Sequence, residues 1–97
     1  MLGEFECRRK SDVMSGVRYD GQRIVVVADT VVLSSENPMW MFEANADGTL
    51  YASGGRLFVK TRDGDHVASP GDVFLRGPDG RVALCRGDAF DEAYEVL

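Results

Sequence analysis

Short apolar segments alternate with turn residues along most of the chain, and this pattern predicts strands rather than long helices. Four Asp-Gly pairs mark turns, because Gly reaches positive φ without strain and Asp bonds to the backbone that follows it. Short strands joined by such turns are typical of an antiparallel sheet. The predicted strands are Val13–Tyr19, Arg23–Leu33, Thr49–Ala52, Arg56–Arg62, Asp65–Ser69, Asp72–Arg76 and Arg81–Arg86.

The segment Arg23–Leu33 differs from the other predicted strands because apolar β-branched residues occupy both of its faces. Val25, Val26 and Val27 follow one another in its first half. β-branched side chains favour pleated backbone, and a strand that is apolar on both faces is normally central in a sheet or covered. We therefore expect one continuous strand that is partly buried on both sides.

Hairpin turns and alternating side chains organise the second half of the chain. Asp63-Gly64 is expected to form a two-residue hairpin turn, and Pro78-Asp79-Gly80 a hairpin loop whose Gly is left-handed. Successive side chains of a strand point to opposite faces. The pattern therefore places Val73 and Leu75 on one face and Phe74 on the other.

Residues 38–46 are predicted to form a short helix. Asn37 suits the N-cap, Pro38 suits the first helical position, and Gly48 supplies a C-terminal stop. The alternative is a strand, because two aromatic residues alternate within this segment. The Met, Glu and Ala residues around them favour the helix.

A second short helix is predicted at the C-terminus, with Asp88 as its N-cap. Apolar residues recur there at helical spacing, opposite acidic residues. The apolar stripe consists of Phe90, Ala93, Tyr94 and Leu97. The pattern as a whole predicts an α+β fold: a small twisted antiparallel β-sheet of about six strands, with a short mid-chain helix and a short C-terminal helix.

The length of 97 residues fits a single domain, residues 1–97, and the net charge is −5. The first ten residues carry five charges and no apolar region, unlike a secretory signal, so we expect a cytoplasmic protein. No apolar run approaches the roughly 18 residues that cross a bilayer. Cys7 and Cys85 are then expected to be reduced thiols, the alternative being a disulfide that closes a long loop.

A series of short motifs follows in a fixed order along the whole chain. They are Arg8-Arg9-Lys10, Val17-Arg18-Tyr19-Asp20-Gly21, Pro38-Met39-Trp40, Phe58-Val59-Lys60-Thr61-Arg62-Asp63-Gly64-Asp65, Pro70-Gly71-Asp72 with Gly77, and Phe90 to Tyr94-Glu95. In this order they resemble a family of small phage and prophage proteins of unknown function, the PGDYG-type proteins. The resemblance implies a phage origin, and it implies no reaction.

The chain departs from the family pattern at three places. Val73-Phe74 follow the Pro-Gly-Asp turn, where the family has an aromatic residue and then Gly, Trp or Ile. Gly80-Arg81 stands where the family has Gly-Glu, and Gln22–Glu36 has no clear counterpart and is expected to be an elaborated strand. The order of the remaining motifs is nevertheless fairly specific.

No catalytic, metal-binding or cofactor-binding residue is predicted. His66 is the only histidine and lies with Asp63 and Asp65 at a predicted hairpin tip, whereas a zinc site needs three or four convergent ligands. Asp72 is interpreted as a structural turn residue whose carboxylate accepts backbone N–H groups. The alternative for Asp72 is a carboxylate in a functional site.

Protein binding is the predicted class of function, with apolar and basic side chains as the candidates. Met39 and Trp40 are of the residue types that anchor interfaces, although core packing explains Trp40 equally well. Arg76, Arg81 and Arg86 lie on adjacent predicted strands. Nucleic-acid binding relies on phosphate neutralisation, which the net negative charge opposes.

We therefore expect a non-catalytic, phage-type protein-interaction module that binds and modulates a host or defence protein in the infected bacterium. An acidic surface would suit blocking a site that normally binds nucleic acid. The alternatives are a virion accessory protein, such as a capsid decoration or connector protein, and a nucleic-acid-binding protein. No cofactor and no membrane contact are expected, and homo-oligomerisation is left open.

Overall fold

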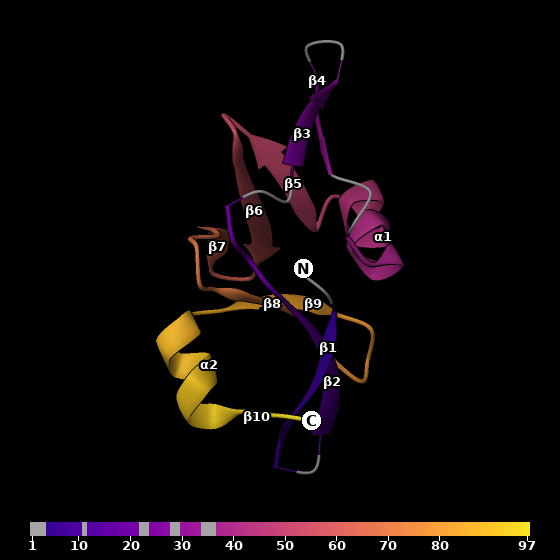
Figure 1. The fold of residues 1–97 in the computed structure, drawn as a ribbon. Coiled ribbons are helices and arrows are strands. Elements are labelled where there is room, and N and C mark those ends of the chain that lie inside the picture. Colours follow the sequence, from indigo (N-terminus) through magenta and orange to yellow (C-terminus); the bar gives the residue numbers. More distant parts are fainter. Residues whose placement is uncertain (1–3, 11, 22–23, 28–29, 34–36) are drawn as a thin grey trace.

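The computed structural model describes residues 4–10, 12–21, 24–27, 30–33 and 37–97. Within these residues ten strands and two helices form an α+β fold (Figure 1). The strands are β1 (Phe5–Arg9), β2 (Asp12–Arg18), β3 (Ile24–Val27), β4 (Thr30–Leu33), β5 (Leu50–Ser53), β6 (Arg56–Thr61), β7 (Gly64–Val67), β8 (Val73–Arg76), β9 (Val82–Cys85) and β10 (Glu95–Val96). The helices are α1 (Met39–Asp47) and α2 (Gly87–Ala93).

The strands form three antiparallel sheets, so the prediction of one sheet of about six strands is wrong. A five-stranded sheet has the order β10-β1-β2-β8-β9, a three-stranded sheet has the order β5-β6-β7, and β3 pairs with β4. The physical reason is that each sheet has an apolar face to bury. Leu57 and Val59 of β6 are fully buried in the same cluster as Val17 and Phe74 of the five-stranded sheet, so β5–β7 pack against that sheet instead of extending it.

The five-stranded sheet separates two hydrophobic clusters, and β8 contributes to both. Phe74 belongs to the first cluster, which the three-stranded sheet and α1 complete. Val73 and Leu75 belong to the second cluster, together with Cys7 of β1 and Phe90 of α2. The predicted alternation of side chains along β8 is therefore confirmed. Through this alternation a strand of only four residues packs into both hydrophobic clusters.

Helix α1 confirms the helix predicted for residues 38–46, with a shift of one residue. It ends at Gly48, whose φ of 88° is left-handed, so the predicted C-terminal stop is also confirmed. The N-terminal prediction is wrong, because Pro38 rather than Asn37 occupies the N-cap and makes no side-chain capping bond. Asn37 instead lies one residue before this N-cap and is buried.

The predicted strand Arg23–Leu33 is a hairpin, in which Val25 pairs with Val32 and Val26 with Val31. Residues 28–29, between these two strands, lie outside the described residues. The hairpin projects from the rest of the fold (Figure 1), and at its base Leu33 is buried in the first cluster. The hairpin was not predicted because β-branched residues predominate in both arms, IVVV in β3 and TVVL in β4.

Residues 5–9 form β1, a strand that was not predicted from the sequence because three of its five residues are charged. Charged residues alternate there with residues that face the second cluster: Cys7 is fully buried, and Phe5 packs against that cluster. β1 lies between β2 and β10. It is thus a strand with one polar and one apolar face.

The C-terminal helix is shorter than predicted, and the predicted cap is wrong. Arg86 occupies the N-cap, while Asp88 lies inside the first turn and accepts a hydrogen bond from the Ala89 N–H at 2.9 Å. After Ala93 the backbone becomes extended, and Glu95–Val96 pair with β1. These two residues thus bond to the edge of β1 in place of the intrahelical bonds of a longer helix.

The predicted turns are largely confirmed by positive φ angles. Gly80 has φ 82° in the loop between β8 and β9, as expected. In the hairpin of β6 and β7, Thr61 pairs with Gly64. The two turn residues are therefore Arg62 and Asp63, one position earlier than predicted. Gly64, with φ 120°, is the first residue of β7.

We predict that Gly87→Ala destabilises the fold although Ala is the better helix former. A Cβ at Gly87 would lie 2.5 Å from the Gly71 carbonyl oxygen, so backbone would have to move. Such overpacking costs about 1–3 kcal/mol, whereas helix propensity alone would stabilise by about 1 kcal/mol. Urea unfolding of the two proteins measures the sign, and a gain in stability would contradict the close approach.

Candidate functional site

A cleft of about 770 Å³ opens where α1, the end of β6 and the hairpin of β8 and β9 meet. Three separate parts of the chain form its walls. The lining residues are Trp40, Glu43, Ala44 and Asp47 from α1, then Thr49, then Lys60, Thr61 and Arg62, and finally Arg76, Asp79, Gly80, Arg81, Val82 and Ala83. Its volume lies in the range of ligand-binding sites, so we take the cleft as the candidate functional site.

The charges of the cleft are divided between its walls. Helix α1 contributes Glu43 and Asp47, whereas the basic residues come from β6, from β8 and from the loops that follow these two strands. Hydrogen bonds from the Thr49 side chain and backbone hold the pKa of Asp47 below its usual range, so Asp47 carries a negative charge at neutral pH. The cleft therefore has an acidic helical side and a largely basic strand side.

Two of the four basic side chains in the cleft have partners. Arg81 lies 3.5 Å from the Asp79 carboxylate, and the Lys60 ammonium lies 5.8 Å from the centre of the Tyr51 ring. Arg62 and Arg76 are exposed and form no ion pair or hydrogen bond within the described part of the chain. These two guanidinium groups are therefore available to a ligand.

Val82 and Ala83 of β9, the strand at one edge of the five-stranded sheet, line the same cleft. The Gly77 N–H donates to the Arg81 carbonyl at 2.9 Å, which makes these residues a hydrogen-bonded pair. Because hydrogen-bonded pairs alternate along an antiparallel ladder, Ala83 also bonds to β8, whereas the backbone groups of Val82 and Leu84 point away from it. No strand of the described chain lies on that side of β9 in the sheet.

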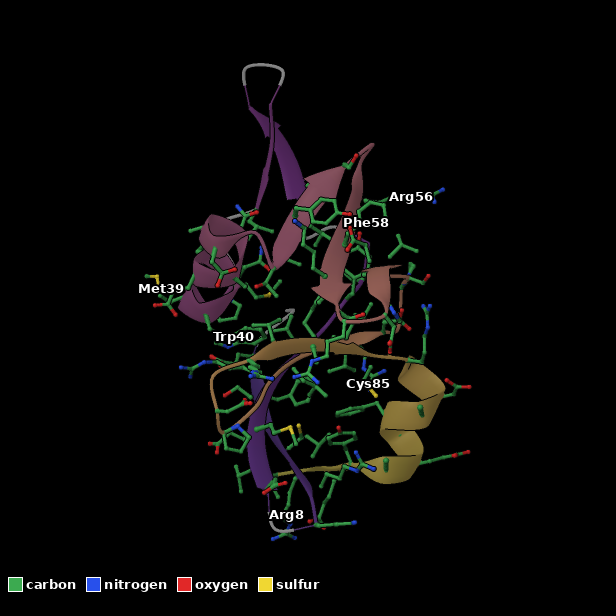
Figure 2. The ribbon with its side chains drawn as sticks, turned by 180° about the vertical axis from the view of Figure 1, so that it is seen from behind. Arg8, Met39, Trp40, Arg56, Phe58 and Cys85 are labelled. Atoms are coloured by element: carbon green, nitrogen blue, oxygen red, sulfur yellow. The ribbon has the colours of Figure 1, made fainter. Side chains whose placement is uncertain are left out.

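The structure brings three of the five predicted binding residues together. Trp40, Arg76 and Arg81 all line the cleft. Trp40 is only 6% exposed, and its indole N–H donates to the Glu4 carboxylate at 2.7 Å, so it forms the floor of the cleft and also belongs to the core. Met39 is 72% exposed and lies outside the cleft on the outer side of α1 (Figure 2).

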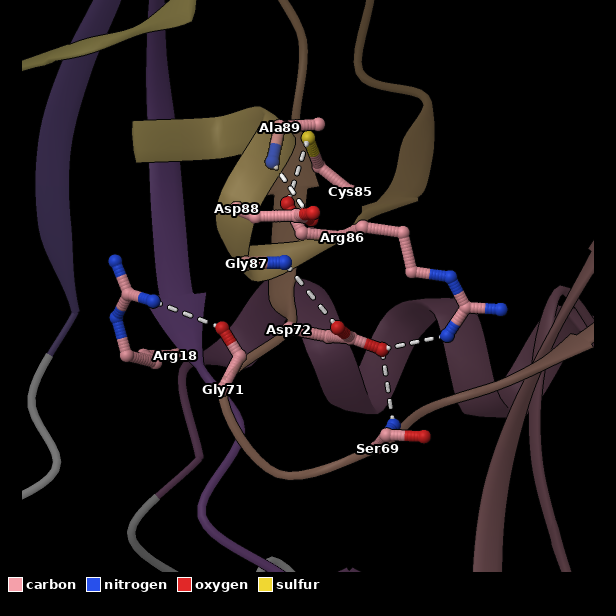
Figure 3. Close-up of polar contacts among 9 residues, drawn as sticks. All are labelled: Arg18, Ser69, Gly71, Asp72, Cys85, Arg86, Gly87, Asp88 and Ala89. Carbon is pink, nitrogen blue, oxygen red and sulfur yellow. Dashed lines mark hydrogen bonds and ion pairs between the residues drawn. The ribbon is translucent and has the colours of Figure 1, made fainter. Parts of the chain in front are cut away.

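Arg86, the fifth predicted binding residue, forms part of a structural network around Asp72 (Figure 3). Asp72 is 5% exposed, and its carboxylate lies 2.9 Å from the Arg86 guanidinium. It also accepts the backbone N–H groups of Ser69 at 3.0 Å and Gly87 at 3.2 Å. The carboxylate thus closes the Pro-Gly-Asp turn and also caps the start of α2, which matches the structural interpretation of Asp72.

Arg18 ties the Pro-Gly-Asp turn to α2 from the other side. Its guanidinium donates to the Gly71 carbonyl at 2.8 Å and to the Asp91 carboxylate at 3.0 Å. It also lies over the Phe90 ring, 5.4 Å from the centroid. The Pro-Gly-Asp turn, which the sequence pattern had indicated, is therefore linked through Arg18 to both β2 and α2.

His66 and the aspartates near it lie at the exposed hairpin of β6 and β7. His66 pairs with Val59 across the strands. Asp65 accepts a hydrogen bond from the Tyr51 hydroxyl at 2.5 Å, and this bond raises the pKa of Tyr51. Within the described residues no group of three or more His, Cys, Asp or Glu side chains could hold a metal ion.

Cys7 and Cys85 are both free thiols in the structure and contact the second cluster. Cys7 is fully buried, and Cys85 is partly exposed next to α2 (Figure 2). Burial is the main cause that raises the pKa of both thiols. Both therefore stay protonated at neutral pH, and the cleft contains neither of them.

Lys60, Arg62 and Glu43 line the cleft but were not predicted from the sequence as binding residues. Lys60 and Arg62 stand in a Lys-Thr-Arg run just before a predicted turn, which is the one local signal available. Their place in the same cleft as Arg76 depends on how the three-stranded sheet packs against the five-stranded one. That packing joins residues far apart in sequence, and no spacing rule reveals it.

Comparison of the chain with protein-family models, with curated proteins and with solved structures finds no match. The resemblance to the PGDYG-type phage proteins therefore stays a prediction from the sequence. No helix in the described residues is long and apolar enough to cross a membrane.

Proposed function

We propose that the chain is a non-catalytic protein-interaction module that docks a partner protein in the cleft. This proposal rests on two exposed guanidinium groups in the cleft, Arg62 and Arg76, which have no ion-pair partner among the described residues, and on β9, which lines the cleft with Val82 and has no further described strand on its outer side. Arg is enriched at protein interfaces, and unpaired sheet edges readily add a strand from another chain. Trp40 and Val82 add apolar side chains to the lining of the cleft.

The biological role that we propose rests on the resemblance to phage proteins. In that role the module binds and modulates a host or defence protein in the cytoplasm of the infected bacterium. A virion accessory protein would use the same surface on a shell component. Mass spectrometry of purified virions separates the two roles, because it detects the chain only in the second.

An affinity experiment tests the docking surface. The full chain is immobilised beside the cleft variant Arg62→Glu/Arg76→Glu, and each is exposed to a lysate of the cells that express the gene. We expect one protein to be retained by the wild type and lost by the cleft variant, because two charge-assisted contacts are reversed.

The matched control is Arg56→Glu/Lys10→Glu, which makes the same change in net charge at exposed positions outside the cleft. Arg56 points outward from the far end of the three-stranded sheet (Figure 2). Circular dichroism verifies that both variants keep the fold. Retention of the same proteins by all three chains would refute docking in the cleft.

A further inference from the structure

We propose that the occupant of the cleft is an extended acidic segment of the partner protein, added as a further strand along the outer edge of β9. This inference rests on the proposed function and specifies the chemistry of the partner. Two features support it, the outward backbone groups of β9 and the guanidinium groups of Arg62 and Arg76, while the acidic wall on α1 argues against a polyanion in its place.

The backbone of β9 is set up to accept a strand. The N–H and C=O groups of Val82 and Leu84 point away from β8, as the bond between Gly77 and Arg81 requires. A peptide that pairs with this edge would satisfy both sets of groups through every second residue, which is the mode of recognition by strand addition. A helical segment would leave them unpaired.

The charge beside this edge selects acidic side chains. Arg76 is opposite Val82 in the pairing of β8 with β9, so it lies next to the edge itself. Arg62 reaches the cleft from the end of β6. A guanidinium group binds a carboxylate through two parallel hydrogen bonds, so one or two Asp or Glu residues in the segment would meet both arginines.

The acidic wall on α1 argues against a polyanion as the occupant. Glu43 and Asp47 face the same hollow as the arginines, and hydrogen bonds from Thr49 keep Asp47 ionised. A nucleic-acid backbone would bring a phosphate against this wall at every nucleotide, and like charges at short distance repel. A peptide with isolated carboxylates between uncharged residues avoids that repulsion.

The apolar part of the cleft favours β-branched or other apolar residues at the remaining positions of the segment. Val82 and Leu84 lie on the face of β9 that packs against the first cluster, and Trp40 and Ala44 form the floor beside it. Side chains of an added strand alternate between this face and the opposite one. The expected partner segment is therefore extended, with Asp or Glu set among apolar residues.

Selection from a library of random displayed peptides, with the folded full chain as the target, tests this inference. We expect enrichment of peptides that place Asp or Glu among β-branched residues. Binding of synthetic copies to Arg62→Glu/Arg76→Glu should weaken at least about tenfold, since two charge-assisted contacts are lost. Binding to the control Arg56→Glu/Lys10→Glu should be unchanged.

N-methylation of the enriched peptide, one backbone nitrogen at a time, separates strand addition from simple charge attraction. Affinity should fall at every second position and stay unchanged at the positions between, because only alternate residues bond to the edge of β9. A single-stranded oligonucleotide is titrated in parallel, and we expect no binding that depends on Arg62 and Arg76.

The outcomes distinguish this inference from the proposed function. Peptides that need the cleft but lack acidic residues, or tolerate N-methylation at all positions, would overturn strand addition by an acidic segment and leave the docking surface standing. Cleft-dependent binding of the oligonucleotide would also overturn it. If no peptide depends on the cleft, the inference fails, while the affinity experiment with whole proteins still decides the proposed function.

Discussion

Phe90→Ala should lower the free energy of unfolding by about 3–5 kcal/mol, the usual cost of removing a fully buried Phe side chain. Phe90 is 1% exposed and lies at the centre of the second cluster. Its ring stacks on Tyr94 at 4.9 Å and meets Phe5 edge-on at 5.8 Å. The substitution therefore removes two aromatic contacts and leaves a cavity between α2 and the five-stranded sheet.

The loss is large because so small a domain has few other sources of stability. A domain of this size loses about 4–8 °C in Tm per kcal/mol, so Phe90→Ala should lower Tm by at least about 12 °C in calorimetry. Phe58→Ala is the matched control, since Phe58 is only partly buried and stacks on Tyr51 on the three-stranded sheet. A shift of only a degree or two for Phe90→Ala would refute the packing of α2.

The local sequence pattern correctly predicted those elements whose structure depends mainly on neighbouring residues. The turns at Gly48 and Gly80 follow from residues that tolerate positive φ, and the alternation of Val73, Phe74 and Leu75 gave the two faces of β8 correctly. These predictions succeeded because each depends on a few neighbouring residues. The α+β class followed from the same local evidence.

The arrangement of the strands into sheets could not be predicted in the same way. β1 and β10 pair across almost the whole length of the chain, through residues such as Cys7 and Val96. The sequence of β10 is a short acidic stretch with helical neighbours, and its pairing is set by the free edge of β1. Tertiary context thus overrode the helical pattern that had included Tyr94 and Leu97.

Only part of the candidate site could be predicted, because residue type is a local signal and the position of a residue in the fold is not. Trp40, Arg76 and Arg81 were singled out by residue type, and these three do meet in the cleft. Arg62 was not, because its importance comes from lining the same cleft as Arg76 with no ion-pair partner among the described residues. Met39 and Arg86 were predicted with equal reason, but one faces outward and the other pairs with Asp72.

Asp72→Ala should cost about 3 kcal/mol of folding stability, although Asp72 lies on a turn and has no role in the proposed docking. Its buried carboxylate accepts two backbone N–H groups, from Ser69 and Gly87, and pairs with Arg86. Hydrogen bonds to a charged group contribute about 1.5–3 kcal/mol each. The Arg86 guanidinium is half exposed and adds little, because water screens the pair.

The effect of this substitution should concentrate at the two ends of the network. Without the carboxylate, the first N–H of α2 loses its acceptor, because the helix has no side-chain cap of its own. Amide exchange should therefore speed up at Ser69 and Gly87, and urea unfolding should give the loss in stability. Asp91→Ala is the control, since Asp91 forms only an exposed ion pair with Arg18 that contributes at most about 1 kcal/mol. Equal losses of stability for the two variants would mean that Asp72 is an ordinary surface carboxylate. A larger loss for Asp72→Ala, with unchanged peptide binding, would show that Asp72 belongs to the scaffold that orients β8 and β9 beside the cleft.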